Sequence, residues 1–184
     1  MTVKEEEQPL TPSEADPEDG LAVDSTSIGS LCISCGLCCD GTLFDEVPLS
    51  PSEGASALWS GLYDEDREAM SPPCTWHDGH LCTVYEDRPA ACRSFECLLI
   101  LRIRRGEVSW DEAREAITAT KSLAAQLSPK LGRLSDGHGI FRRVQDTAGA
   151  LITSPMTNDN VELMLDLAEF RLRRASFVAR RMPT

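Results

Sequence analysis

The sequence contains no apolar run long enough to cross a membrane. A spanning helix needs ~18–20 apolar residues. The longest apolar stretch of the 184-residue chain, residues 97–103, is far shorter and already includes an arginine. The first ten residues, MTVKEEEQPL, also lack the basic and apolar regions of a signal peptide. We therefore expect a soluble, cytoplasmic protein with no membrane partner.

Basic residues are scarce as well. The chain has 18 Lys and Arg against 30 Asp and Glu, a formal net charge of −12. This balance argues against a general nucleic-acid binder, because phosphate contacts need a basic surface. Residues 1–28 hold eight acidic residues, one lysine and three prolines, with almost no large apolar side chains. Since such a segment cannot offset the entropy of ordering, we predict a disordered acidic tail at 1–28.

The remaining residues, 29–184, are predicted to form a single domain. Its cysteine-rich metal-binding part covers 29–105, and its helical part covers 106–184. Aromatic residues make up only 5% of the chain, so the core should consist mostly of Leu, Ala, Ile and Val. The expected fold class is mainly α, with an irregular, cysteine-rich, metal-centred segment and few short strands.

Capping signals locate several helices. The capping boxes SPSE at 50–53 and SWDE at 109–112 predict helices from residue 51 to about 62 and over 110–128. A basic last turn before Gly106 predicts a helix over 94–105. A last helix is expected from Asn158 or Asn160 to about Arg180, with an apolar stripe formed by Val161, Met164, Ala168, Leu172 and Ala175. The segment IFRRV at 140–144 is predicted to be a short strand.

Cysteines are absent from the last 87 residues, and all eight lie between residues 32 and 97. In the reducing cytosol they are better candidates for metal ligands or catalytic thiols than for disulfides. The first set has the pattern C-x2-C-x2-C-C, and the second is spaced more widely. The candidate metal ligands are Cys32, Cys35, Cys38, Cys39, Cys74, Cys82, Cys92 and Cys97.

The spacing of the first set indicates a thiolate centre. A C-x2-C step lets two thiolates converge on one ion, and three such thiolates suit either zinc or an iron–sulfur cluster. Cys38 and Cys39 are adjacent, so their side chains should point in different directions. Two arrangements follow: two four-cysteine sites that share the 32–39 segment, or one site with spare, reactive or structural thiols. His77 and His80 are alternative ligands or exposed loop residues.

Thiolate clusters carry excess negative charge, which nearby cations or N–H donors must compensate. Arg88 and Arg93 flank Cys92 and are the candidates for this role, with ordinary surface pairing to Glu86 or Asp87 as the alternative. A cluster of arginines near the C-terminus could bind an acidic partner or, more simply, complement the end of a helix.

The two cysteine segments together resemble a known family. CISCGLCC at 32–39 and CTVYEDRPAACRSFEC at 82–97 are similar to the CxxCxxCC family of zinc- or iron-chelating proteins, the YkgJ-like cysteine-cluster proteins, to which flagellin lysine N-methylase is related. The resemblance covers about residues 30–105. It rests on Cys32, Cys35, Gly36, Cys38, Cys39, Cys82, Tyr85, Arg88, Pro89, Cys92, Arg93, Phe95 and Cys97.

The resemblance implies metal binding, with zinc or a four-iron (4Fe-4S) cluster as the cofactor. It also implies an alternative function, an iron–sulfur-dependent methyltransferase or oxidoreductase acting on a protein or small molecule. A redox-sensing module is a second alternative. The chain lacks a G-x-G-x-G loop for S-adenosylmethionine and the radical signature C-x3-C-x2-C. Whether it is an enzyme therefore stays open, as do its substrate and its partners.

Overall fold

Helices make up most of the regular structure. The computed structural model describes residues 25–79, 81–131 and 137–178, which are mainly helical with few short strands, as predicted. The helices are α1 (Ser25–Cys35), α2 (Pro51–Gly54), α3 (Ala90–Ser94), α4 (Leu98–Arg104), α5 (Trp110–Leu127), α6 (Ile140–Leu151) and α7 (Asn158–Ala175); the strands are β1 (Val47–Pro48), β2 (Tyr63–Asp64) and β3 (Ala69–Met70).

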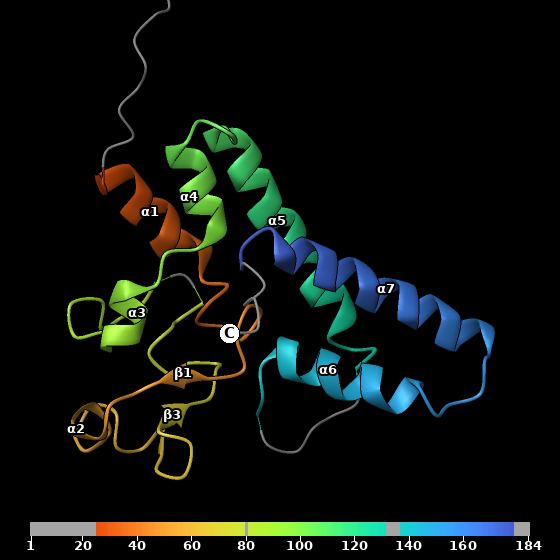
Figure 1. Ribbon diagram of the computed structural model, residues 1–184, viewed down its shortest axis with the longest axis horizontal. Coiled ribbons are helices and arrows are strands. Elements are labelled where there is room, and N and C mark those ends of the chain that lie inside the picture. Colours follow the sequence, from red (N-terminus) through yellow and green to blue (C-terminus); the bar gives the residue numbers. More distant parts are fainter. Residues whose placement is uncertain (1–24, 80, 132–136, 179–184) are drawn as a thin grey trace, which may run out of the picture.

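The long helices α5, α6 and α7 pack together at one end of the molecule (Figure 1). The predicted capping box opens α5: Ser109 Oγ accepts the N–H of Glu112, and the Glu112 carboxylate accepts the N–H of Ser109. The helix covers the predicted range to within a residue. Its buried face is Ala113, Ile117, Thr120, Leu123 and Leu127. The second half of this face packs against α6 and α7.

The segment IFRRV begins α6, so the predicted strand is wrong. Ile140, Val144 and Leu151 are buried on one side of the helix. They pack against Leu167 and Phe170 of α7. Residues four and seven positions apart share a helix face, and the five-residue window was too short to reveal this period.

The last helix begins at the predicted place, where the Thr157 side chain accepts the N–H of Asn160. Its regular part ends at Ala175 rather than near Arg180. Among the described residues of α7, the buried ones are Leu167 and Phe170. The predicted apolar stripe lies on the exposed side instead: Val161, Met164, Ala168, Leu172 and Ala175. The helix therefore has two apolar faces. The face of Leu167 and Phe170 packs in the core, and the predicted face does not.

Residues 90–104 contain two helices, α3 and α4, where one helix over 94–105 was predicted. Ser94 ends α3, and α4 begins only at Leu98, with Cys97 as its N-cap. The backbone at Phe95 and Cys97 is extended, and Cys97 Sγ accepts the N–H of Ile100 at 3.5 Å. The glycine after α4 is confirmed as its terminator, since Gly106 has a φ of 68°.

A small antiparallel sheet lies apart from the long helices, with strand order β1-β3-β2. Met70 of β3 pairs with both Val47 and Tyr63. The predicted capping box of Ser50 opens α2, but this helix ends at Gly54 instead of about residue 62. The ring of Tyr63 packs directly on Gly54. Trp59 packs with Leu49 and Met70 in an apolar cluster.

The predicted acidic tail falls mostly outside the described residues. Its last four residues, 25–28, belong to α1. Within the described part of the chain, no helix combines the length and hydropathy required to span a membrane.

Candidate metal centre

A tight turn after α1 presents the first cysteine segment. Gly36 follows the helix with a φ of 67°, a left-handed conformation that favours glycine. Its carbonyl accepts the N–H groups of Cys39 at 2.9 Å and Asp40 at 3.0 Å. The side chain of Leu37 is fully buried below the turn. The turn therefore fixes the directions of the adjacent residues Cys38 and Cys39.

The first group of thiols joins α1 to the start of α4. Cys32 and Cys35 lie one helical turn apart on α1, Cys38 follows in the turn, and Cys97 caps α4. Burial raises the pKa of Cys35 to about 12, and the thiols of Cys32 and Cys97 add to the rise. Burial also raises the pKa of Cys38 well above its ordinary value, with contributions from Cys35, Cys32, Cys39 and Cys97. These thiols lie close enough to influence one another's ionisation.

The second group gathers around Cys39. Burial raises the pKa of Cys39 to about 12, and the thiols of Cys74, Cys82 and Cys92 raise it further, ahead of Cys32. Burial raises the pKa of Cys92 to about 11, with Cys74 and Cys82 contributing. The pKa of Cys74 is raised by burial and by Cys82. Apart from the influence of Cys39 on the adjacent Cys38 and of Cys32 on Cys39, the thiols thus fall into two sets of four, with Cys38 and Cys39 in different sets.

The apolar packing divides the cysteines in the same way. Cys35, Cys38 and Cys97 pack against a core cluster that includes Leu37 and Leu99. Cys74 and Cys92 pack against the separate cluster of Leu49, Trp59 and Met70. The packing of these five cysteines therefore agrees with the grouping by electrostatic proximity. We refer to Cys32, Cys35, Cys38 and Cys97 as the first group and to Cys39, Cys74, Cys82 and Cys92 as the second group.

Backbone hydrogen bonds hold the second group together. The N–H of Cys74 donates to the carbonyl of Cys39 at 2.8 Å, which joins segments 35 residues apart in the chain. Cys82 lies opposite His77, three residues after Cys74, because these two residues form an antiparallel bridge. The N–H of Thr83 donates to the carbonyl of Trp76 at 2.8 Å and extends this pairing.

A carboxylate from α2 positions the helix that carries Cys92. Glu53 Oε1 accepts the N–H of Ala90 at 2.7 Å. The preceding residue, Pro89, provides no side-chain cap for α3, so Glu53 acts as a cap supplied from elsewhere in the chain. The sequence reveals Glu53 as part of a capping box but gives no signal for this second partner, which lies 37 residues away.

All eight cysteines are free thiols, which excludes disulfides among them in this structure. Because burial disfavours the thiolate, a cation is needed to hold these groups in their ionised, metal-binding form. Within residues 25–79, 81–131 and 137–178, no three Cys, His, Asp or Glu side chains already have the geometry of a metal site. The number and chemical type of the donors in each group fit a four-thiolate centre.

The guanidinium of Arg88 lies within reach of both groups. Its positive charge lowers the pKa of Cys32 and of Cys92, although burial dominates at both thiols. Its position is fixed by Tyr85: the guanidinium carbon lies 3.4 Å from the ring centroid, and Nε donates to the Tyr85 carbonyl at 2.6 Å. Arg93 is exposed and instead donates to the carbonyl of Arg88. Of the two predicted arginines, Arg88 therefore has the better position to offset thiolate charge.

The side chain of His77 lies between the two cysteine segments. Its Nε2 atom is buried and has no hydrogen-bond partner among the described residues. A Cβ atom placed on Gly36 would lie 2.6 Å from this nitrogen, so the ring packs on the backbone of the first turn. His77 can therefore donate to, or ligate, a bound group at this position. The other candidate histidine, His80, lies outside the described residues.

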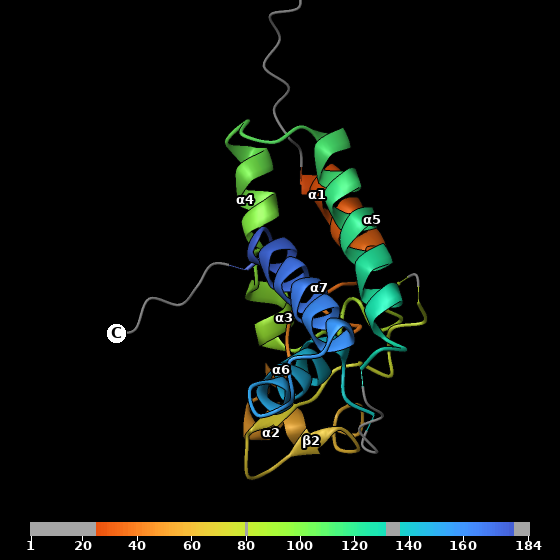
Figure 2. The same cartoon turned by 90° about the vertical axis from the view of Figure 1, so that its right-hand side faces the viewer.

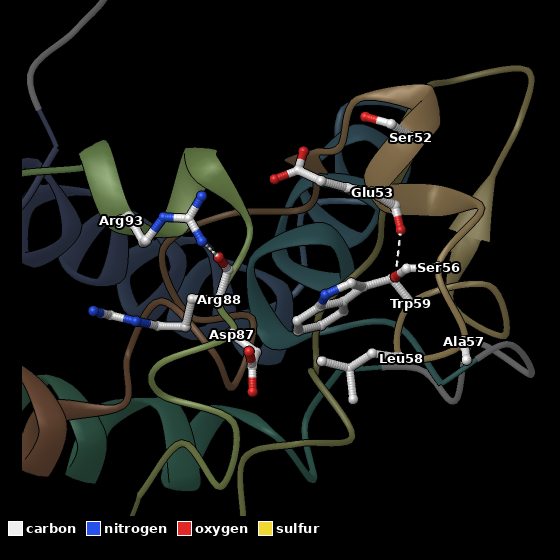
Figure 3. Close-up of a pocket in the computed structure, with 9 residues that line it drawn as sticks. All are labelled: Ser52, Glu53, Ser56, Ala57, Leu58, Trp59, Asp87, Arg88 and Arg93. Carbon is white, nitrogen blue, oxygen red and sulfur yellow. Dashed lines mark hydrogen bonds between the residues drawn. The ribbon is translucent and has the colours of Figure 1, made fainter.

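A cavity of about 570 Å³ opens beside α3. Figure 3 shows Arg88 and Arg93 on one side and Glu53 and Ser56 on the other, with the indole of Trp59 between them. Two of its lining residues also act on Cys92: Glu53 positions the helix that carries this cysteine, and the charge of Arg88 lowers its pKa. Phe95 is 39% exposed, and its ring meets the Phe44 ring edge-on with the two centroids 4.9 Å apart.

Comparison with known proteins yields one family. The model of the CxxCxxCC family, described as a putative zinc- or iron-chelating domain, matches residues 31–121. The matched range includes all eight cysteines, α1 from Leu31 onward, and α5 to Lys121. No curated protein and no solved structure gave a significant match.

Proposed function

Because residues 31–121 belong to the CxxCxxCC family, we propose that this protein binds metal at two centres, each held by four thiolates. The first group, Cys32, Cys35, Cys38 and Cys97, forms one centre. The second group, Cys39, Cys74, Cys82 and Cys92, forms the other. The observation that carries the proposal is the mutual influence of the thiols within two sets of four, which the packing of five of them supports.

Either zinc or an iron–sulfur cluster matches these donors. Four thiolates close the coordination shell of zinc and make a structural site, whereas an iron–sulfur cluster would add electron-transfer chemistry. One zinc ion with four thiolates carries a charge of about −2. Arg88, which reaches both groups, is suited to offset part of that charge.

The need for metal is clearest at the second group. Its apolar cluster contains three fully buried hydrophobic residues, Leu49, Trp59 and Met70, and the strands beside it are two residues long. So small a core contributes little stability by itself. A metal held by Cys39, Cys74, Cys82 and Cys92 would tie this part of the chain to the turn after α1, so the proposed role of this centre is to organise the fold.

Anaerobic purification followed by metal and sulfide analysis tests the proposal. Colourless protein with about two zinc ions per chain identifies two zinc centres, and brown protein with iron and acid-labile sulfide identifies clusters. Cys35→Ser and Cys74→Ser serve as matched variants, one from each group. Each should lose one centre and keep the other. A folded protein that binds no metal, or a single variant that loses both centres while remaining folded, would contradict two independent centres.

A further inference from the structure

The side chain of His77 contains a buried polar atom without a partner. No described residue forms a hydrogen bond with its Nε2 atom. Buried polar atoms in folded proteins nearly always have a partner, because an unsatisfied one keeps the full cost of losing its water. An exception of this kind indicates a bound group, either a water molecule or a ligand, that reaches the atom. The surroundings of the ring show which of the two fits better.

A short hairpin sets the direction of the His77 side chain. His77 and Cys82 lie opposite each other in an antiparallel bridge. The hydrogen bonds of the hairpin join the residues on either side of this pair, from the N–H of Thr83 to the carbonyl of Trp76 at 2.8 Å and from the N–H of Asp78 to that of Leu81 at 3.1 Å. His77 and Cys82 are therefore a non-hydrogen-bonded pair, in which the two side chains lie on the same face and approach closely.

The ring also lies against the turn that presents Cys39. A Cβ atom placed on Gly36 would lie 2.6 Å from His77 Nε2. The N–H of His77 donates to the Cys74 carbonyl at 3.1 Å, and the N–H of Cys74 donates to the Cys39 carbonyl at 2.8 Å. Figure 1 and Figure 2 both show residues 74–79 near the C-terminal end of α1. His77 is thus connected to three of the four second-group cysteines, Cys39, Cys74 and Cys82.

We infer that His77 is a hydrogen-bond donor to the second centre, whose Nε2–H donates to a thiolate of the second group, Cys82 being the one on its face of the hairpin. The inference rests on the proposed metal centres. Four thiolates already complete the coordination shell, so the ring acts as a donor and not as a further ligand. A thiolate also accepts a stronger, charge-assisted hydrogen bond than water does. The bond would offset negative charge at the centre and fix the direction of its sulfur ligand.

Nuclear magnetic resonance of the full chain loaded with a spin-active cadmium isotope tests the bond. Cadmium prefers thiolate ligands, and its spin couples through a ligand sulfur to a proton that is hydrogen-bonded to that sulfur. The cadmium signal that Cys74→Ser removes should couple to the Hε2 proton of His77. Direct coupling between cadmium and a ring nitrogen would make His77 a ligand and overturn the inference.

Two further results separate the inference from the proposed function. If both centres hold cadmium and neither couples to the His77 ring, water is the partner of Nε2, so the donor role is refuted and the two centres stand. If the folded chain binds no cadmium at all, both the donor role and the proposed centres are refuted.

Two substitutions distinguish the donor from the packing of the ring. His77→Phe keeps a ring against Gly36 but has no N–H, whereas His77→Gln keeps an N–H donor but has no ring. Competition with a chelator should show that His77→Phe binds metal at the second centre about 10- to 100-fold more weakly, and that His77→Gln recovers most of this loss. The first centre of each variant is the internal control, and circular dichroism reports folding. Natural affinity in His77→Phe would mean that only the packing matters, which would overturn the inference.

Discussion

Cys38 and Cys39 are joined by a single peptide bond, yet their thiols belong to different groups. Cys38 lies with Cys35 and Cys97, and Cys39 lies with Cys74 and Cys92. The turn of Gly36 produces this divergence, since its carbonyl accepts the N–H of Cys39. Any two centres built on these groups would share the turn, and their positions would be linked through its backbone.

The adjacent thiols give the sharpest test of this division. We predict that Cys38→Ser removes the centre at α1 and α4 and that Cys39→Ser removes the centre at the second group. Each variant should retain about half of the metal, because the substitution removes one donor from one centre and leaves all four donors of the other. Metal analysis after gel filtration measures the loss, and limited proteolysis locates it. Cleavage between residues 40 and 90 should increase for Cys39→Ser alone.

The bond between Glu53 and Ala90 provides a second prediction. Glu53→Gln weakens two interactions at once, the capping box with Ser50 and the cap of α3. Glu112→Gln is the matched control, since Glu112 closes a similar box at Ser109, and in the described part of the chain its carboxylate bonds to Ser109 and not to α3. Glu53→Gln should cost about 1 kcal/mol of stability and lower metal affinity at the second group. Glu112→Gln should leave metal affinity unchanged, and equal affinities in the two variants would contradict a positioning role for Glu53.

The same carboxylate predicts a pH dependence. Hydrogen bonds from Ala90 and Ser50 hold the pKa of Glu53 below its ordinary value. A carboxyl group with a lowered pKa stabilises the folded state above its unfolded pKa of about 4.3, and this contribution disappears as pH falls through the folded pKa. The stability difference between the natural chain and Glu53→Gln should therefore be present at neutral pH and shrink below about pH 4. Urea unfolding at several pH values measures it.

Local signals in the sequence predicted the starts of helices well. The boxes at Ser50 and Ser109 depend on residues three positions apart, so they can be seen without tertiary structure. The end of α2 could not be predicted in this way. The ring of Tyr63, from strand β2, packs on Gly54, and this contact between separate elements cannot be seen in the local sequence.

The buried face of α7 shows why the rest could not be predicted. The sequence carries two apolar stripes on this helix, one through Leu165 and Leu172 and one through Leu167 and Phe170. Only the positions of α5 and α6 decide which stripe enters the core. The grouping of the cysteines is similar: the motif identifies the candidate donors, but the fold places Cys97 with α1 and Cys92 with the sheet region.

The contact between Gly36 and His77 yields a fourth prediction. Gly36→Ala should destabilise the protein for two reasons: its φ of 67° strains a non-glycine residue, and the new methyl group would lie 2.6 Å from His77 Nε2. Gly106→Ala is the control, because Gly106 has a φ of 68° with open space around it. The control should cost about 1 kcal/mol.

The difference between these two variants isolates the contact with His77. Gly36→Ala should cost more than Gly106→Ala in chemical unfolding and should also lower the metal content of the purified chain. Gly36→Ala combined with His77→Ala should recover part of the loss, because the ring no longer blocks the methyl group. If the two single glycine variants are equally stable, the packing of His77 on the turn contributes nothing.

Protons released on metal binding give a fifth prediction. The pKa of each thiol in the first group is raised, chiefly by burial, so these thiols keep their protons at neutral pH when no metal is bound. Their raised folded pKa values stabilise the metal-free fold below the unfolded thiol pKa, and this contribution is lost as pH rises toward the folded values. Metal binding has the opposite dependence, because thiolates are the ligands.

The first group can be studied alone in Cys39→Ser. Titration of this variant with zinc in buffers of different ionisation enthalpy should show release of about four protons per ion near pH 7. Zinc affinity should therefore rise steeply with pH, while the metal-free chain loses stability above about pH 9. Release of one proton or fewer would mean that most of these thiols are already ionised or do not bind the ion. In that case, burial would not control the protonation of the first-group thiols.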